Sequence, residues 1–336
     1  MKLGRYISRR LGIMLIQLIG IIVITFFLNR LLPGDPVQAR LGPLATPEAK
    51  AMLTAKMGLD KPLHIQFVRY VSGLLQGDLG NSWRTGNPVL KDILQRFPTT
   101  FELITWAMIS ALVIGVAVGA YAALHPNGFV DRSTLFYSLL AGAMPDFYIG
   151  LVLIFVFFYL LGIAPAPMGR IDVYLSRPPT VTGSYIIDGM LAGDWQVAKS
   201  AAAHLVLPVA TLAFVYTGAF LKMTRSTMRQ MFESDFMHYA RINGLPRAIT
   251  RQYGLKTTLP PVVNLFGMIY AFVLGAAVLI ETVFGLAGLG QYSVQSIVSA
   301  DYEALSGFML VAAVFYLIIY LLVDIIQAFL DPRIRY

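Results

Sequence analysis

Six long apolar stretches constrain the fold of this chain more than any other feature of its sequence. A helix needs about 20 mostly apolar residues to cross a hydrocarbon core of roughly 30 Å. Each stretch is close to that length and carries at most one charged residue. We therefore predict an all-α integral membrane protein with six transmembrane helices, over Leu11–Asn29, Leu103–Leu124, Leu135–Leu161, His204–Leu221, Val262–Ile280 and Leu305–Val323.

The composition agrees with this class and excludes others. Hydrophobic residues make up 57% of the chain and charged residues only 13%, whereas soluble proteins average roughly 45–50% and about 25%. This excludes a disordered chain, a coiled coil, collagen and an ordinary cytosolic enzyme. The chain has no cysteine, and its four histidines lie far apart. We therefore expect no disulfide, thiol nucleophile, zinc–thiolate site or other metal site.

The distribution of basic residues predicts the topology. With the N-terminus inside, the cytoplasmic parts 1–10, 125–134, 222–261 and 330–336 hold 14 Lys and Arg, whereas 162–203 holds three and 281–304 none. The long segment 30–102 does not count, because long loops translocate largely regardless of charge. Both termini are therefore predicted to be cytoplasmic, and the net charge of +8 reflects topology, not nucleic-acid binding. The first stretch is too long for a signal peptide and no A-x-A site follows it, so we expect it to be retained.

The chain divides into residues 1–29 with the first span, an external region 30–102, and a core 103–336 with five spans. The external region opens with the turn Pro33-Gly34-Asp35-Pro36. Thr46 as N-cap and Pro47 predict a helix to about Met57, and Leu63–Leu75 is a second amphipathic segment. We expect a small helical cap here and irregular external structure in the Pro- and Gly-rich loop 162–203.

The cytoplasmic segment 222–261 predicts an elbow of two helices. Ser234-Asp235 can cap a helix over Phe236–Asn243, Gly244 suits the left-handed residue after it, and Pro246 can open a second helix over roughly Arg247–Thr257. Such an elbow is either an amphipathic hairpin held by anionic lipid or an element that docks into a groove of a cytoplasmic partner. The pattern alone leaves both alternatives open.

This elbow and a series of short motifs resemble the permeases of ABC importers, and more specifically the first permease of dipeptide, oligopeptide and nickel uptake systems. The elbow contributes Asp235-Phe236, Ala240-Arg241 and Gly244, followed by Leu259-Pro260-Pro261-Val262-Val263. The other motifs, in chain order, are Arg9-Arg10-Leu11, Leu32-Pro33-Gly34-Asp35-Pro36, Gly58-Leu59-Asp60-Lys61-Pro62, Gly77-Asp78-Leu79-Gly80-Asn81-Ser82, Met223-Thr224-Arg225-Ser226, Glu281-Thr282-Val283-Phe284, Gly288-Leu289-Gly290 and Asp331-Pro332-Arg333-Ile334-Arg335.

The resemblance implies the type I ABC importer permease fold and a transport subunit for peptides or related small solutes, not an enzyme. It implies four kinds of partner in a bacterial inner membrane: a second homologous permease in a heterodimer, two ATP-binding cytoplasmic subunits, an external substrate-binding protein and membrane lipid. The chain has no G-x-x-x-x-G-K-[ST] phosphate loop. ATP and Mg are therefore expected on the ATPase subunits, and this chain is expected to bind no cofactor. Transport would follow alternating access.

The resemblance also assigns the contacts that couple the permease to its ATPases. Gly244 is expected to serve backbone geometry, and Ala240 to allow close approach to a neighbouring surface. The sequence departs from the family at His238, which replaces an acidic residue in many permeases, at Tyr239, where the residue is usually small, and over Tyr253–Thr258. The coupling residues carried over are Asp235, Phe236, Ala240, Arg241, Gly244 and Leu245.

Ionisable residues inside spans are candidates for function, because a charge in hydrocarbon is costly unless it faces a cavity or a partner. Asp146 follows Pro145 near the middle of its span. It either lines the translocation pathway, favouring a cationic or amine-bearing substrate, or pairs with the partner permease. Glu281, at the outer end of its span, has an exposed, helix-capping or pathway role. Asp324, near the inner face, is expected to pair with a cytoplasmic Arg or Lys.

Two other functional classes remain as alternatives. An ATP-independent secondary transporter or channel subunit is the first, but we find no internal repeat of the kind secondary transporters show, and no filter-like segment. An intramembrane enzyme is the second, but the spans offer only isolated acids and His204. A dedicated cytoplasmic ATPase partner would distinguish the permease from both.

Overall fold

The computed structural model describes residues 3–31, 36–42 and 44–330, and within them every regular element is a helix. The only β interaction in these residues is an isolated bridge between Asn81 and Pro88. The predicted all-α class is therefore confirmed. The motif residues Leu32–Asp35 and Asp331–Arg335 lie outside the described residues.

Five helices are long and apolar enough to cross a membrane, and a bent pair of shorter ones makes a sixth candidate. The five long helices, which contain the first, second, fourth, fifth and sixth predicted spans, are α1 (Leu3–Leu31), α5 (Val89–Leu124), α9 (Trp195–Glu233), α11 (Arg247–Val283) and α13 (Tyr302–Leu330). They extend well beyond the apolar stretches. The predicted boundary after residue 102 falls inside α5.

The third predicted span is not one straight helix. It consists of α6 (Phe129–Ala143) and a second piece, α7 (Asp146–Leu153) continued by the π-helix η1 (Ile154–Leu160), and the two pieces are bent by 106°. The break lies at Met144, which has extended backbone angles before Pro145. The helical region is disfavoured for a residue before proline. The predicted third span over Leu135–Leu161 therefore corresponds to a sharply bent pair of helices, and the count of six spans is consistent with the structure.

A close crossing of α5 and α9 forms the centre of the bundle. A Cβ atom placed on Gly119 would lie 2.7 Å from the carbonyl oxygen of Leu221, and one on Gly115 would lie 3.1 Å from the backbone nitrogen of the same residue. Without side chains at these glycines, the two backbones approach directly, as small residues allow in membrane helix pairs. Buried side chains of α5, α9, α11 and α13 form the main apolar core around this crossing.

Outside the spans, the predicted cap helices are present as α3 (Pro47–Lys56) and α4 (Leu63–Leu75), preceded by α2 (Pro36–Leu41). Thr46 Oγ1 accepts a hydrogen bond from the backbone nitrogen of Ala49 at 3.3 Å, which confirms its N-cap role. Two short helices, α8 (Tyr185–Leu191) and α12 (Leu289–Val298), were not predicted. The loop 162–203 is therefore less irregular than expected.

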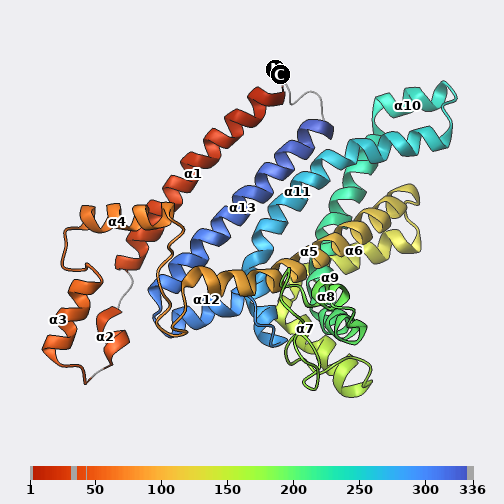
Figure 1. The fold of residues 1–336 in the computed structure, drawn as a ribbon. Helices are drawn as coiled ribbons and strands as arrows, with labels where there is room; N and C mark the ends of the chain where they lie inside the picture. Colours follow the sequence, from red (N-terminus) through yellow and green to blue (C-terminus); the bar gives the residue numbers. More distant parts are fainter. Residues whose placement is uncertain (1–2, 32–35, 43, 331–336) are drawn as a thin grey trace.

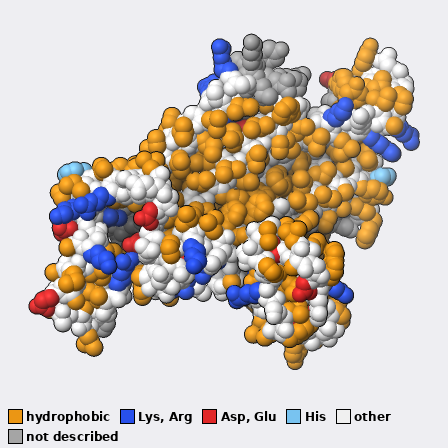
Figure 2. All heavy atoms as spheres, viewed as in Figure 1, with side chains coloured by type: hydrophobic (Ala, Val, Ile, Leu, Met, Phe, Trp, Pro, Cys, Tyr) orange, Lys and Arg blue, Asp and Glu red, His pale blue; other side chains and the backbone are white. Residues whose placement is uncertain are grey.

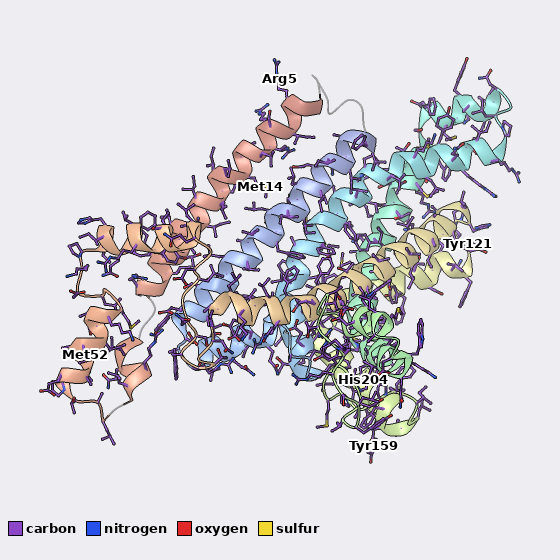
Figure 3. All side chains as sticks on the ribbon, in the orientation of Figure 1. Arg5, Met14, Met52, Tyr121, Tyr159 and His204 are labelled. Carbon is purple, nitrogen blue, oxygen red and sulfur yellow. The ribbon has the colours of Figure 1, made fainter. Side chains whose placement is uncertain are left out.

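The long helices separate two ends of the molecule. One end holds the start of α1, the end of α13 and α10 (Asp235–Ile242), whereas α2, α3, α7 and α8 lie toward the other (Figure 1). Arg5 and Tyr159 mark the two ends in Figure 3. Hydrophobic side chains cover the helices between these ends, and Lys and Arg lie toward both ends, near the start of α1 and around α10 at one and around α3 and α4 at the other (Figure 2). This pattern is that of a protein embedded in a bilayer.

Candidate functional site

The predicted elbow is formed by α10 and the start of α11. Ser234 ends α9 and begins α10, and its hydroxyl accepts a hydrogen bond from the backbone nitrogen of Met237 at 3.4 Å. Gly244 has φ +74°, and the nitrogens of Gly244 and Leu245 donate to the carbonyls of Arg241 (3.0 Å) and Ala240 (3.1 Å). This pair of bonds is a Schellman motif, which requires a left-handed residue at the glycine. The predicted elbow is therefore confirmed to within one residue at each end of α10.

The second arm of the elbow differs from the prediction. The prediction of a separate helix over Arg247–Thr257 was wrong at its end. The helix begins at Arg247 as predicted, but α11 continues without interruption to Val283 and includes Pro260 and Pro261. Each proline removes one backbone hydrogen bond from a helix, yet the apolar sequence that follows packs in the core and carries the helix on. The elbow is thus joined directly to a membrane span.

The side chains of α10 divide into a buried and an exposed face. Met237 is fully buried and Ala240 is 6% exposed, whereas Phe236, Tyr239 and Ile242 are 59%, 69% and 71% exposed. Ala240 therefore packs within this chain, and its expected close approach to a neighbouring surface stays a prediction. Tyr239 and Ile242 were missed as candidates. Their spacing of three residues from Phe236 onward places all three on one side of a helix.

The remaining coupling candidates lie around this exposed face. Asp235 is exposed in the first turn of α10 and Arg241 in the last, so that each charge complements the helix dipole. The guanidinium of Arg241 lies 5.8 Å from the ring centroid of Phe232 on α9. Leu245 is partly buried after the glycine turn. The elbow brings all six predicted coupling residues together within a few turns of chain.

Glu281 lies at the opposite end of α11 and is fully buried. One carboxylate oxygen accepts a hydrogen bond from the hydroxyl of Thr100 on α5, and the other accepts from the backbone nitrogen of Gln291 at 3.0 Å. Leu289 donates to Thr100 Oγ1 at 2.8 Å. Of the roles expected for Glu281, exposure is wrong, and capping is the one observed, because the carboxylate caps α12. Neither Thr100 nor Gln291 was predicted to take part.

The glycines beside Glu281 leave space for its carboxylate. A Cβ atom at Gly288 would lie 2.3 Å from a carboxylate oxygen, and one at Gly290 would lie 2.5 Å from the backbone of Val278. The motifs Glu281-Thr282-Val283-Phe284 and Gly288-Leu289-Gly290 therefore form one structural unit. This unit ties α5, α11 and α12 together.

The other two acids of the spans make simpler contacts. Asp146 begins α7, is partly buried and accepts a hydrogen bond from the hydroxyl of Tyr216 on α9 at 3.2 Å. Asp324 forms an ion pair with Arg10 at 2.9 Å, which confirms the expected pairing and joins α13 to α1. The hydrogen bonds of Asp146 and Glu281 share no partner, so the two pathway candidates are not joined in one site.

A polar network that the sequence did not reveal fixes the loop 162–203. Arg170 pairs with Glu102 of α5 at 3.1 Å and lies 3.8 Å from the ring centroid of Tyr185. Asp188 accepts hydrogen bonds from the backbone nitrogens of Val181, Thr182 and Gly183. Burial acts to raise the pKa of Asp188, but these bonds outweigh it and hold the pKa below its usual value.

Within the described residues, no group of three or more His, Asp or Glu side chains is arranged to hold a metal ion. His204 Nδ1 lies 2.9 Å from the carbonyl of Ser200 one turn earlier, and its Nε2 lies 3.9 Å from the carboxylate of Asp172 in the loop 162–203. Several of the sequence motifs acquire a specific structure at the two ends of α11, around Gly244 and around Glu281.

Comparison with known proteins identifies the family of this chain. Residues 115–336 match the family described as "binding-protein-dependent transport system inner membrane component", and residues 3–104 match its N-terminal region. The chain belongs to this family. It is therefore a permease subunit of an ABC transporter and not an enzyme.

Three relatives align over nearly the whole chain. The probable D,D-dipeptide transport system permease of Escherichia coli is 39% identical over 94% of this chain and 93% of its own length. The dipeptide permease of Alkalihalophilus pseudofirmus is 34% identical (98% and 99%). The di/tripeptide permease of Pseudomonas aeruginosa is 35% identical (98% of both). The resemblance predicted from the motifs is confirmed.

Proposed function

We propose that this permease forms half of the translocation pathway of an ATP-driven importer for short peptides in the bacterial inner membrane. The observation that carries the proposal is the exposed apolar face of α10, formed by Phe236, Tyr239 and Ile242 at the end of the bundle where α1 begins and α13 ends. The excess of Lys and Arg at this end, counted without the long segment 30–102, supports a cytoplasmic orientation. An exposed apolar face of this kind is typical of a surface that contacts a partner.

The partner that we propose for α10 is a cytoplasmic ATPase subunit, with two such subunits in the complex binding ATP and Mg. A short amphipathic helix seated in a groove is a common mode of recognition. A second homologous permease would complete the pathway as a heterodimer, and an external binding protein would deliver the substrate. The names of the relatives, which are permeases for dipeptides and di/tripeptides, support short peptides as the substrate class.

The coupling step follows from the connection between the two ends of α11. The Schellman turn at Gly244 fixes α10 relative to Arg247, where α11 begins. A displacement of α10 on closure of the ATPases is therefore transmitted to α11 and reaches Glu281 at the other end. Because Glu281 holds α5 and α12, the motion repositions external elements and opens or closes the pathway in alternating access.

Asp146 is our candidate for substrate contact. It is partly buried at the bend between α6 and α7 and has one hydrogen bond, from Tyr216. Among the described residues no basic side chain pairs with it. A carboxylate in this position suits the amino group of a peptide, and the alternative is a pair with the second permease. Glu281, whose oxygens are already bonded, would act by positioning the pathway and not by touching the substrate.

Purification of the tagged complex in mild detergent, with identification of every chain and an assay of ATP hydrolysis, tests this function. We expect a second six-span permease and one or two kinds of ATPase. A homo-oligomer without an ATPase would contradict the proposal and favour a channel or secondary transporter. A full complex that hydrolyses ATP but takes up no peptide would support the ATP-driven mechanism and contradict short peptides as the substrate class.

A further inference from the structure

A basic cavity of about 910 Å³ lies between the elbow and the turn that joins α5 to α6. Its walls come from the end of α9, from α10 and α11, and from His125–Asn127. The charged residues that line it are Arg229, Arg241, Arg247, Arg251 and Glu233, with His125 beside them. Four guanidinium groups therefore face one carboxylate.

The positive charge of this cavity is only partly neutralised by the protein. Arg229 shares its charge between Asp131, at 3.8 Å, and Glu233, at 3.9 Å, and Asp131 is already bonded to Arg225. Among the described residues, no carboxylate lies within ion-pair distance of Arg241, Arg247 or Arg251. A cavity with this balance is complementary to an anion.

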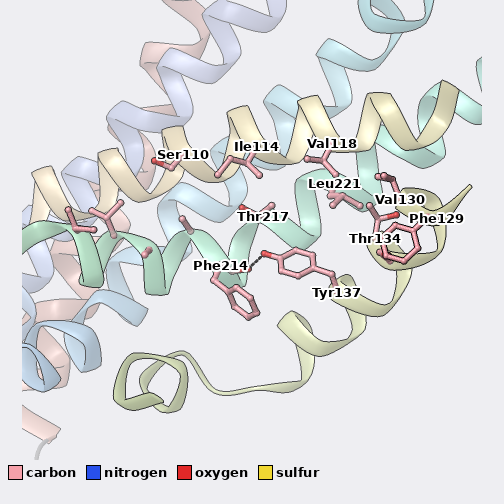
Figure 4. Close-up of a pocket in the computed structure, with 15 residues that line it drawn as sticks. Ser110, Ile114, Val118, Phe129, Val130, Thr134, Tyr137, Phe214, Thr217 and Leu221 are labelled. Atoms are coloured by element: carbon pink, nitrogen blue, oxygen red, sulfur yellow. Dashed lines mark hydrogen bonds between the residues drawn. The ribbon is translucent and has the colours of Figure 1, made fainter. Parts of the chain in front are cut away.

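An apolar groove of about 710 Å³ lies along α5, α6 and α9, and its residues are drawn in Figure 4. Its lining is almost entirely apolar. The hydroxyl of Tyr137 projects toward α9, where it donates to the carbonyl of Phe214 (Figure 4). Val206, which also lines the groove, is 60% exposed. The groove lies on spans of the bundle and therefore at the depth of hydrocarbon, where an apolar chain can fill it.

The groove leads toward the basic cavity along the same helices. On α9, Phe232 of the cavity follows Leu221 of the groove by eleven residues. A separation of eleven residues returns to one face of an α-helix. His125 of the cavity lies directly after the last residue of α5, whose Val118 lines the groove. The turn residue Asn127 of the cavity likewise precedes Phe129 of the groove. The cationic and the apolar regions are thus arranged end to end.

We propose that this pair of cavities binds one anionic phospholipid, with its phosphate among Arg241, Arg247 and Arg251 and its acyl chains in the groove of α5, α6 and α9. Basic pockets between spans at the cytoplasmic surface are suited to such headgroups. A soluble anion would use the cavity and leave the groove unused. The exposed face of α10 that we assign to the ATPase is formed by other residues, Phe236, Tyr239 and Ile242. The lipid would join the elbow to the α5–α6 turn.

Native mass spectrometry of the intact purified complex tests the proposal, with added phosphatidylglycerol and phosphatidylethanolamine of identical acyl chains. We expect the wild-type complex to retain the anionic lipid at least about tenfold more than the zwitterionic one. R247Q/R251Q should abolish this preference. R5Q/R9Q removes an equal number of charges from exposed positions near the start of α1 and should preserve the preference. V206W, which fills the groove from an exposed position, should lower retention of phosphatidylglycerol.

Equal retention of the two lipids by the wild-type complex would overturn the proposal, as would an equal loss in R5Q/R9Q. Displacement of phosphatidylglycerol by millimolar inorganic phosphate would assign the cavity to a soluble anion. Because the chain has no cysteine, V206C provides a single attachment point, and its cross-linking to the second permease would show that a helix occupies the groove. If R247Q/R251Q does not assemble, the wild-type comparison and V206W still decide.

Discussion

The carboxylate of Glu281 at the end of α11 accepts a hydrogen bond at 3.0 Å from the backbone nitrogen of Gln291 in the first turn of α12. The other oxygen of the same carboxylate binds Thr100 of α5. A fully buried acid thus serves as the common acceptor of α12, which follows it in the chain, and of α5, whose Thr100 is 181 positions away. Its removal affects the junction of three helices.

We predict that Glu281→Ala destabilises the complex more than Glu281→Gln does. Alanine leaves the Gln291 nitrogen and the Thr100 hydroxyl without their acceptor in a buried site, at a cost of about 1–3 kcal/mol for each unsatisfied group. Glutamine keeps one acceptor oxygen and approximately the same volume. Thermal unfolding of the detergent-purified complex measures the difference. Thr282→Val, at the exposed neighbour, is the control, and equal melting temperatures for Glu281→Ala and wild type would contradict the prediction.

We predict that Gly244→Val abolishes coupled transport and leaves membrane insertion normal. No atom lies within 4 Å of the position that a Cβ would occupy, so the obstacle is the backbone angle φ of +74°. The left-handed conformation costs an L-residue roughly 1–2 kcal/mol and is especially unfavourable for a β-branched one. Gly244→Asn is the matched control, because asparagine tolerates this conformation. Uptake and ATP hydrolysis are measured together, and wild-type uptake by Gly244→Val would refute the assignment.

Ile242→Asp is expected to release the ATPase subunits. The substitution places a charge in the apolar face of α10, and its desolvation on docking would weaken the contact by about 2–4 kcal/mol, or at least tenfold in affinity. Gln252→Asp adds the same charge at an exposed polar position of α11 and should have little effect. The ratio of ATPase to permease in the purified complex gives the result. Full retention of the ATPase by Ile242→Asp would show that this face is not the docking surface.

Gly119→Val is expected to prevent correct packing of α5 against α9. The added Cβ would lie 2.7 Å from the carbonyl oxygen of Leu221, which is backbone and cannot rotate away. Overpacking of this kind typically costs about 1–3 kcal/mol. Gly142→Ala, where no atom lies within 4 Å, controls for the loss of a helix glycine. The yield of monodisperse protein in size-exclusion chromatography measures folding, and equal yields for the two variants would contradict the packing argument.

We predict that the ionised form of Asp188 stabilises the loop 162–203. Its pKa is lowered in the folded protein, so this contribution is fully present above the unfolded carboxyl pKa, near 3.9, and is lost as the pH falls through the folded pKa. Asp188→Asn should therefore lower the melting temperature at neutral pH, and the difference from wild type should shrink in acid. Glu48→Gln, in the separate helix α3, is the control. A difference that is independent of pH would assign the effect to shape and not to charge.

The parts of the structure that the sequence predicted correctly depend on local signals. Ser234, Gly244 and Pro246 are a cap, a left-handed residue and a helix start within a short distance, so the elbow was predicted almost to the residue. The cap helix Leu63–Leu75 was likewise predicted with its observed bounds. Such signals act through neighbouring backbone groups and need no knowledge of the rest of the fold.

The parts that were missed depend on contacts across the fold. Thr100 and Glu281 are 181 positions apart, and nothing in either segment indicates that they meet. The size of the bend at Pro145 was also missed, because the apolar stretch continues on both sides of it. The exposure of Tyr239 and Ile242 depends on how α10 is rotated against its neighbours, which the sequence does not fix.

The continuity of α11 has a mechanical consequence. At 1.5 Å per residue, its 37 residues measure about 55 Å, so that Arg247 and Glu281 are near the two ends of one lever. Pro260 and Pro261, about a third of the way along, remove consecutive backbone hydrogen bonds, so that bending of α11 is expected to concentrate there. The longer part of the helix, from Pro261 to Glu281, would then swing as one rigid segment when α10 moves.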